Sequence, residues 1–335
     1  MNGNVGVSMQ HVVGIVGGAG FIGLSLASYL NKNYRVKLLD VRRPESLPHN
    51  VIFEKCDIRY YNLVRKCLRN VDVVVNTAII QIPAINEYKR LGYEVNFLGT
   101  HNVCRAVDEL KRPKGLILAG SWHVFGEREL KGVIDEEFGF RPDKAEDRAR
   151  LYVLSKIAQE VIVRCFKEMS DKDYAVIRMG TVLGEGMPEK TAANIFITRG
   201  LKGEPITPYR HSMHRPMLYV DVNDVVMGYE SLIEKMLSGK NTPPAVNLFY
   251  PEPITVLELA EIVKDVITEL TGGRIMPKIE VVDKGIPPLF TPEDKNKFSV
   301  DISKSLKALG IDSLTHPRES VKRIIRVRLE TMQNA

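Results

Sequence analysis

The fold is decided by the stretch Val12-Val13-Gly14-Ile15-Val16-Gly17-Gly18-Ala19-Gly20-Phe21-Ile22-Gly23. An apolar run rich in β-branched side chains leads directly into a turn with glycines at 17, 20 and 23, and helix-forming sequence follows. The pattern predicts a buried parallel strand, a tight turn and a helix N-terminus. Glycine lets the main chain turn sharply and approach a pyrophosphate, and the unpaired N–H groups of the first helical turn attract its charge.

An acidic residue lies at a suitable distance from this turn. A second apolar run, 34–39, ends in Asp40, about twenty residues on, where dinucleotide-binding folds place the carboxylate that binds the adenosine ribose. The sequence therefore predicts dinucleotide binding rather than a purely structural turn. Asp40 would repel a 2′-phosphate and favours NAD, whereas Arg42 and Arg43 could accompany such a phosphate in NADP. The acid nearest the ribose makes NAD the predicted cofactor.

The bulk composition is that of an ordinary globular protein. The chain has 335 residues, 44% hydrophobic and 26% charged, with a net charge of +6. Its Lys and Arg residues are scattered, which favours a small anionic ligand over nucleic acid. No apolar run is long enough to span a membrane, and residues 1–10 lack the pattern of a signal peptide. We expect these ten residues to be a flexible leader of a cytoplasmic protein.

The four cysteines, Cys56, Cys67, Cys104 and Cys165, form no CxxC pair and no metal-ligand spacing with histidine. They indicate reduced thiols in a reducing compartment and no metal site.

The order of the predicted elements indicates the fold class. Strands are predicted at 12–16, 35–39, 51–54, 72–77, 115–120 and 174–179, and helices at 21–31, 60–69, 84–110 and 145–169. Such alternation predicts an α/β protein with a Rossmann-type doubly wound parallel sheet. Beyond residue 182 loops lengthen and prolines gather around helices predicted at 190–202, 221–238, 255–271 and 317–332.

We therefore predict an NAD-binding Rossmann domain over 11–182, with a return segment at about 216–250. A smaller α/β C-terminal cap for the substrate would comprise 183–215 and 251–335. In open α/β sheets the ligand binds outside the carboxyl ends of the strands, where such a cap would lie.

Two side chains capable of proton transfer share one helix face. Tyr152 and Lys156 stand four residues apart in the predicted helix. A tyrosine titrates near pH 10, and a neighbouring ammonium together with a positive nicotinamide ring would lower that pKa. Ser121, at the end of the strand 115–120, is placed to hydrogen-bond a reacting oxygen. The alternative readings are a solvated helix pair and a serine that simply ends a strand.

Taken together, these motifs resemble the extended short-chain dehydrogenase/reductases. More narrowly, they look like the NAD-dependent nucleotide-sugar epimerase/dehydratase group, to which UDP-glucose 4-epimerases belong. The residues that carry the resemblance are Gly17 to Gly23, Asp40, Cys56-Asp57-Ile58-Arg59, Asn96 within 95–100, Ser121 within 121–126, and Tyr152 with Lys156.

The resemblance implies roles for individual residues. Tyr152 would be the acid and base, Lys156 would assist it and bind the nicotinamide ribose, and Ser121 would orient the substrate hydroxyl. The residues implied to bind the cofactor are Gly17, Gly20, Phe21, Ile22, Gly23, Asp40, Asp57, Ile58, Ala78, Asn96, Tyr152 and Lys156. Relatives pair through a four-helix bundle, so helices 84–110 and 145–169 would form a homodimer interface.

The chain departs from this group on the substrate side. Thr181 stands where epimerases commonly have an asparagine that helps to hold the phosphates. Trp122 and His123 replace the Asp-Glu pair of dehydratases, which argues against elimination. Trp122 would line the sugar pocket or simply pack, and His123 would be a second acid/base or a hydrogen-bonded pocket residue. Arg215, in the basic loop 210–215, would contact the substrate diphosphate.

Three functions remain open from the sequence. The first is an NAD-dependent nucleotide-sugar epimerase, most simply a UDP-sugar 4-epimerase that works by transient hydride transfer. The second is an NAD(P)-dependent dehydrogenase or reductase of a different hydroxyl or carbonyl substrate. The third is a non-catalytic NAD-binding regulator, against which the Ser121, Tyr152 and Lys156 set argues.

Overall fold

The computed structural model of the protein describes residues 11–333; the predicted leader lies outside this range. Seven strands form one sheet in the order β11-β7-β5-β4-β1-β2-β3, and every neighbouring pair is parallel. The strands are β1 Val12–Val16, β2 Arg35–Asp40, β3 Val51–Lys55, β4 Val73–Asn76, β5 Gly115–Ser121, β7 Asp173–Met179 and β11 Ala245–Leu248. The strand order reverses between β1 and β4, so the predicted doubly wound sheet is confirmed.

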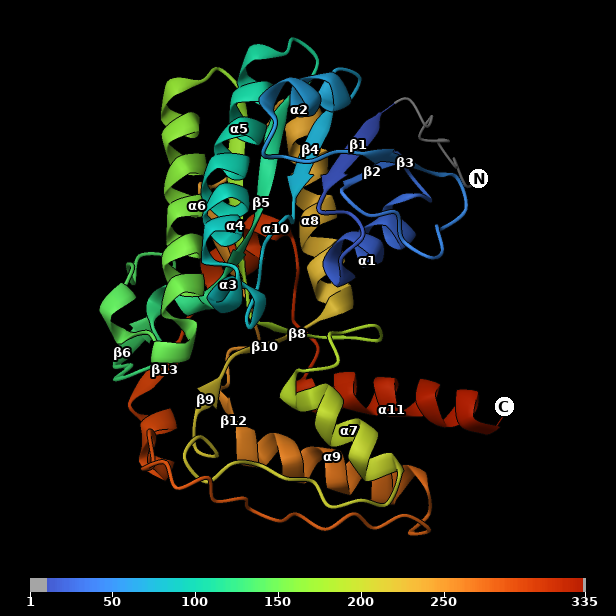
Figure 1. The fold of residues 1–335 in the computed structure, drawn as a ribbon, viewed down its shortest axis with the longest axis vertical. Helices are drawn as coiled ribbons and strands as arrows, with labels where there is room; N and C mark the ends of the chain where they lie inside the picture. The colour runs from blue at the N-terminus through green and yellow to red at the C-terminus, as the bar shows by residue number, and fades with distance from the viewer. Residues whose placement is uncertain (1–10, 334–335) are drawn as a thin grey trace.

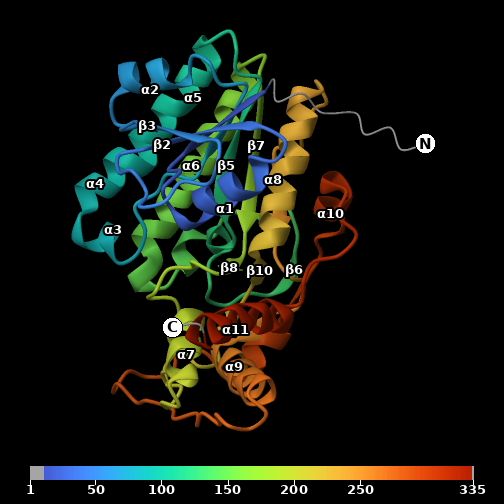
Figure 2. The ribbon, with the colours of Figure 1, turned by 90° about the vertical axis from the view of Figure 1, so that its right-hand side faces the viewer.

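Helices cover both faces of this sheet (Figures 1 and 2). One face packs against α1 (Phe21–Leu30) and α8 (Val222–Leu237), which also contact each other. The other carries α2 (Tyr61–Leu68), α5 (Thr100–Glu109) and α6 (Arg150–Met169). The interior strands β4 and β5 are buried along their whole length. Two covered faces explain why these strands read as continuous apolar runs.

The prediction of a single helix at 84–110 is wrong. The chain instead forms α3 (Ala84–Glu87), α4 (Lys89–Tyr93), a π-helical turn (Glu94–Gly99) and then α5. The break falls at Tyr88, whose backbone angles of −115° and 59° are not helical. Similarly, α6 begins at Arg150 rather than at 145, after 3₁₀ turns at Pro142–Lys144 and Asp147–Ala149.

The rest of the chain lies beyond one end of the sheet (Figure 1). There α7 (Ala192–Leu201), α9 (Val256–Leu270) and α11 (Pro317–Gln333) enclose a separate apolar core. Small two-stranded sheets tie this region together: β8 (Thr181–Leu183) with β10 (Tyr219–Asp221), β9 (Pro216–Met217) with β12 (Ile254–Thr255), and β6 (Gly132–Ile134) with β13 (Phe298–Val300). The last short helix, α10 (Ser303–Leu309), contacts β11. Since β8 starts directly after β7, this region lies at the carboxyl end of the sheet.

Within residues 11–333 no helix is long and apolar enough to cross a membrane.

Candidate active site

The glycine turn brings three backbone segments into direct contact. Gly17 has a φ of +75°, and its N–H donates to the carbonyl of Leu39 at 2.8 Å. A Cβ on Gly17 would lie 2.5 Å from the backbone nitrogen of Ala78, and a Cβ on Gly23 would lie 2.6 Å from Cα of Gly18. These two glycines are therefore required by packing within the protein itself.

Gly20 is a glycine for a different reason. Its backbone angles of −79° and 168° suit any residue, and a Cβ there would meet only the carbonyl oxygen of Gly17, at 3.4 Å. It is the N-cap of α1 and offers no side chain to the free N–H groups of that helix. The helix N-terminus therefore opens onto space without a competing protein acceptor, as a pyrophosphate requires.

Asp40 stands beside this turn at the end of β2. One carboxylate oxygen accepts the N–H of Ala19 at 3.0 Å and the other accepts the N–H of Arg42 at 3.2 Å. The carboxylate is thus fixed next to the glycines, where a ribose would lie. Together the bare helix end and the anchored acid fit a dinucleotide with a free 2′-hydroxyl.

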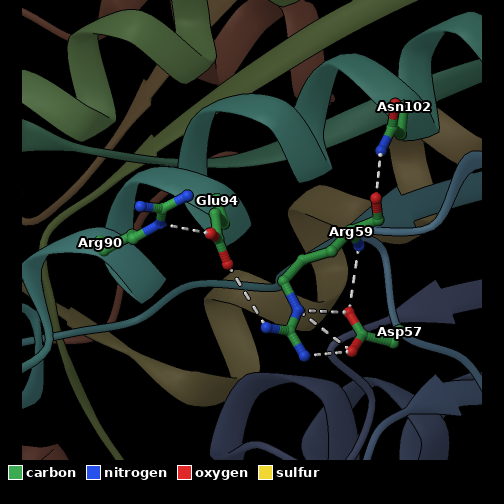
Figure 3. Close-up of polar contacts among 5 residues, drawn as sticks. All are labelled: Asp57, Arg59, Arg90, Glu94 and Asn102. Carbon is green, nitrogen blue, oxygen red and sulfur yellow. Dashed lines mark hydrogen bonds and ion pairs between the residues drawn. The ribbon is translucent and has the colours of Figure 1, made fainter.

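Asp57 is held by the neighbouring Arg59 (Figure 3), and Ile58 is held through its carbonyl. Arg59 binds Asp57 through Nη2 at 2.6 Å and Nε at 3.0 Å, and reaches Glu94 at 3.4 Å. The hydrogen bonds from Arg59 lower the pKa of Asp57. Asn102 donates to the carbonyl of Ile58 at 2.9 Å. The adenine border predicted here is therefore charged, rigid and tied to the π-helical turn.

Asn96 makes all its contacts with the protein. Its side-chain oxygen accepts the N–H of Ile80 at 2.8 Å, and its amide donates to the carbonyl of Ile80 at 3.1 Å and to the Ser155 hydroxyl at 3.0 Å. Asn96 thus joins the segment after β4 to α6, where its partner Ser155 directly precedes Lys156. Ala78 is fixed similarly, since its carbonyl accepts the Gln159 amide at 3.3 Å. Both residues position the site rather than offer free polar groups.

Ser121, Tyr152 and Lys156 meet where β5 ends beside α6. Lys156 Nζ donates to the carbonyl of Ala119 at 2.8 Å, and the Ser121 hydroxyl is near enough to the Tyr152 side chain to act on its pKa. Ser121 and Lys156 are buried. The end of strand β5 and the helix α6 therefore bring the three predicted side chains together.

The charge states of this group differ from expectation. Burial raises the pKa of Tyr152, and only the hydrogen bond from Ser121 opposes it. Burial also lowers the pKa of Lys156 to about 7. In the protein without cofactor the pKa of Tyr152 is therefore raised and not lowered as predicted, because desolvation is the largest influence on it.

His123 adjoins the group, with its ring edge-to-face against the ring of Tyr152 at a centroid distance of 5.8 Å. Its Nδ1 lies 3.0 Å from the Ser121 hydroxyl and its Nε2 lies 3.5 Å from Oε1 of Glu127. Burial, followed by the nearby Arg148 and Arg215, lowers the pKa of His123 to about 3. The imidazole is therefore neutral and hydrogen-bonded, which is the simpler of its two predicted roles. Trp122 is fully buried in an apolar cluster, which favours packing over pocket lining.

Arg215 is close to this group but is not free. It is buried and binds the carboxylate of Glu146, with Nη2 at 2.6 Å from Oε2. Thr181 starts β8, half-buried, with its N–H on the carbonyl of Leu218 at 2.7 Å. Glu127 and Glu146 were not predicted from the sequence. No local motif marks them, because Glu146 meets Arg215 across 69 positions of the chain.

Other candidate features lie elsewhere. A cavity of about 450 Å³ is lined by α1, the N-terminal turn of α8, and residues 185–186, and none of Ser121, Tyr152 or Lys156 lines it. Among residues 11–333 no three His, Cys, Asp or Glu side chains are grouped so as to hold a metal ion.

A doubly wound sheet, a glycine turn with an acid at the end of β2, and a Ser-Tyr-Lys group define a nucleotide-dependent enzyme of the short-chain dehydrogenase/reductase type. The chain belongs to the NAD-dependent epimerase/dehydratase family, whose family model matches residues 13–248. That family depends on NAD, which confirms the predicted cofactor.

Comparison with individual proteins agrees with this assignment. The chain is 24% identical over 319 residues to UDP-glucuronic acid decarboxylase 1 of Danio rerio, covering 93% of this chain and 71% of that protein. It is 29% identical over 243 residues to a candidate UDP-glucose 4-epimerase of Methanocaldococcus jannaschii, covering 68% of this chain and 77% of that protein. The fold matches the UDP-glucose 4-epimerase of Thermus thermophilus in complex with NAD, with a TM-score of 0.75, 23% identity, and coverage of 94% and 98%.

Proposed function

We propose that this protein is an NAD-dependent nucleotide-sugar epimerase, most simply a 4-epimerase of a UDP-sugar. The observation that carries the proposal is the placement of Ser121, Tyr152 and Lys156 around the carboxyl end of β5: Lys156 binds the Ala119 carbonyl, Ser121 binds His123, and the His123 ring packs against Tyr152. The relatives named for UDP-glucose and UDP-glucuronic acid support a nucleotide-linked sugar as the substrate.

In this proposal the positive nicotinamide of bound NAD, together with Lys156, would ionise Tyr152. The tyrosinate then removes the proton of a ring hydroxyl, and Ser121 holds the reacting oxygen. Gly17, Gly20, Asp40 and Lys156 would hold NAD, whose nicotinamide would supply a reversible acceptor for the hydride of the reacting carbon. Loss of the proton and hydride would convert the alcohol to a ketone. Return of the hydride to the opposite face of the ketone carbon, with return of the proton from Tyr152, would give the epimer. Lys156, fixed by the Ala119 carbonyl, would hold the ribose hydroxyls and oppose the desolvation of the tyrosinate.

A second candidate is a net dehydrogenase or reductase of a smaller substrate. Thr181 favours it, because epimerases commonly have at this position an asparagine that helps to hold the phosphates. Decarboxylation of a UDP-uronic acid is a third reaction to be tested, since such decarboxylases are among the relatives.

One experiment separates these reactions. The protein is incubated with NAD and UDP-glucose, UDP-galactose or UDP-glucuronic acid, and products are followed by proton NMR together with absorbance at the NADH wavelength. We expect a second sugar without net NADH. Accumulating NADH would support the dehydrogenase, loss of carbon dioxide would support the decarboxylase, and activity unchanged in Tyr152→Phe would exclude the proposed chemistry.

A further inference from the structure

One carboxylate in the substrate region is held by two guanidinium groups. Glu146 is buried, and its Oε2 lies 2.6 Å from Nη2 of Arg215 and 2.9 Å from Nε of Arg148. Nε of Arg215 also contacts the other carboxylate oxygen. The Arg215 guanidinium lies 5.5 Å above the ring of Phe290, which fixes its plane. The arginines thus form a preorganised fork that already contains an anion.

This fork is connected to the proton-transfer group. The N–H of Glu146 donates to Oε2 of Glu127 at 3.0 Å, and Oε1 of Glu127 lies 3.5 Å from His123, which binds Ser121. Arg148, Arg215 and Glu146 all act on the charge of His123. A continuous chain of contacts through Glu127 and His123 therefore joins the fork to Ser121.

The two arginines are the only side chains to which the Glu146 carboxylate is hydrogen-bonded within residues 11–333. Glu146 is the N-cap of the short turn Asp147–Ala149, and its side chain makes no capping hydrogen bond there. The side chain of Arg148 is 52% exposed, so one half of the fork faces solvent. Burying an ion pair costs desolvation nearly equal to its attraction, so a ligand with more negative charge can displace one carboxylate.

Resting on the proposed function, we propose that Glu146 is a resident anion which the diphosphate of the substrate displaces from Arg215 and Arg148. Glu146 then selects ligands by charge. A diphosphate carries more negative charge than the Glu146 carboxylate and displaces it, whereas a neutral or singly charged sugar does not. The residue acts on substrate selection and does not take part in proton transfer.

The test is calorimetric titration of the NAD-loaded protein with UDP and, separately, with inorganic pyrophosphate. We expect Glu146→Gln to bind both ligands on the order of tenfold more tightly than wild type, because the amide keeps the shape but not the charge. The gain should disappear in Glu146→Gln combined with Arg215→Met. The matched control is Glu129→Gln, which removes an exposed ion pair with Lys144 and should change nothing.

A purely structural ion pair predicts the opposite result. In that case Glu146→Gln would lower the melting temperature and leave binding equal or weaker, which would overturn the proposal. If Glu146→Gln binds pyrophosphate more tightly but UDP with unchanged affinity, the displacement of Glu146 by an anion is supported and a nucleotide substrate is contradicted. If Glu146→Gln does not fold, Arg148→Gln decides: weaker binding of both ligands is expected, and unchanged binding contradicts the proposal.

Discussion

Asp40 holds its carboxylate beside the glycine turn through two main-chain N–H groups, those of Ala19 and Arg42. A 2′-phosphate at this place would face like-charge repulsion, whereas two ribose hydroxyls would donate to the acid. We expect Asp40→Ser to weaken NAD binding about tenfold, since hydrogen bonds to charged groups contribute about 1.5–3 kcal/mol. Binding of NADP should improve in the same variant because Arg42 and Arg43 remain. Dissociation constants for both cofactors check this, and an unchanged ratio would count against the role of Asp40.

His123 gives the protein a defined sensitivity to acid. Its pKa is lowered by burial to about 3 in the folded protein, against about 6.5 in an unfolded chain. Below pH 6.5 the unfolded chain therefore binds a proton that the folded protein excludes, and stability falls as the pH falls. Between pH 7.5 and 5.5 this amounts to about 1.4 kcal/mol of unfolding free energy.

Urea unfolding at these two pH values measures the loss. The His123→Gln variant should lose about 1.4 kcal/mol less than wild type on acidification, whereas the exposed His49→Gln should behave like wild type. Equal losses in the wild type and His123→Gln would show that this imidazole is not the group responsible.

At the scale of elements, the glycine turn separates packing from ligand binding. In Gly17→Ala the alanine must adopt the left-handed backbone conformation of Gly17, which costs ~1–2 kcal/mol. Its Cβ would also lie 2.5 Å from the backbone nitrogen of Ala78. Gly20→Ala has neither problem. We expect the first variant to have a clearly lower melting temperature and the second to melt near wild type but bind NAD at least tenfold more weakly. Normal NAD affinity in Gly20→Ala would remove the pyrophosphate from this helix end.

The elements differ in how far sequence could predict them. Strands β1 and β4 are local: their apolar runs and the neighbouring glycines are enough to identify them. The break at Tyr88 is not marked by a glycine or proline at that position. Farther along the segment the packing is non-local, since a Cβ on Gly99 would lie 2.6 Å from the side chain of Ile58. Strand β11 was not predicted because its four residues follow a proline-rich loop and become a strand only beside β7.

The site shows the same division. Tyr152 and Lys156 share a helix, so their spacing of four residues predicted that they lie together. Ser121 was predicted from its position at the end of a strand. Glu146 and Arg215 meet only through the folding of the whole chain, and no spacing rule links them. The positions where this chain departs from its relatives were therefore visible, but the partner of Arg215 was not.

At the scale of the whole molecule, one helix face has no partner in the single chain. Leu154, Val161 and Cys165 lie along one side of α6 and are exposed, and Leu98 and Tyr93 are exposed in the neighbouring helical segment. Exposed apolar side chains gathered in this way suit an interface. We propose that a second copy of the chain packs on this face, as a four-helix bundle of two α6 helices and their neighbours.

Cysteine labelling tests the assembly. Of the four free cysteines only Cys165 is exposed, and the other three are buried. In a dimer Cys165 should react at least tenfold more slowly with a thiol reagent than in Val161→Glu, whose charge would separate the chains. Sedimentation should give a dimer for wild type and a monomer for Val161→Glu. Rapid labelling of one thiol in wild type would contradict this interface.

The central claim is that a hydride leaves the sugar and returns to the same molecule within the bound complex. The most direct measurement uses UDP-glucose deuterated at C4, with the protein, NAD and an excess of unlabelled NADH. The account predicts that the epimer forms and keeps its deuterium at C4. Deuterium found in free NADH, with unlabelled sugar or a ketone as the product, would contradict it.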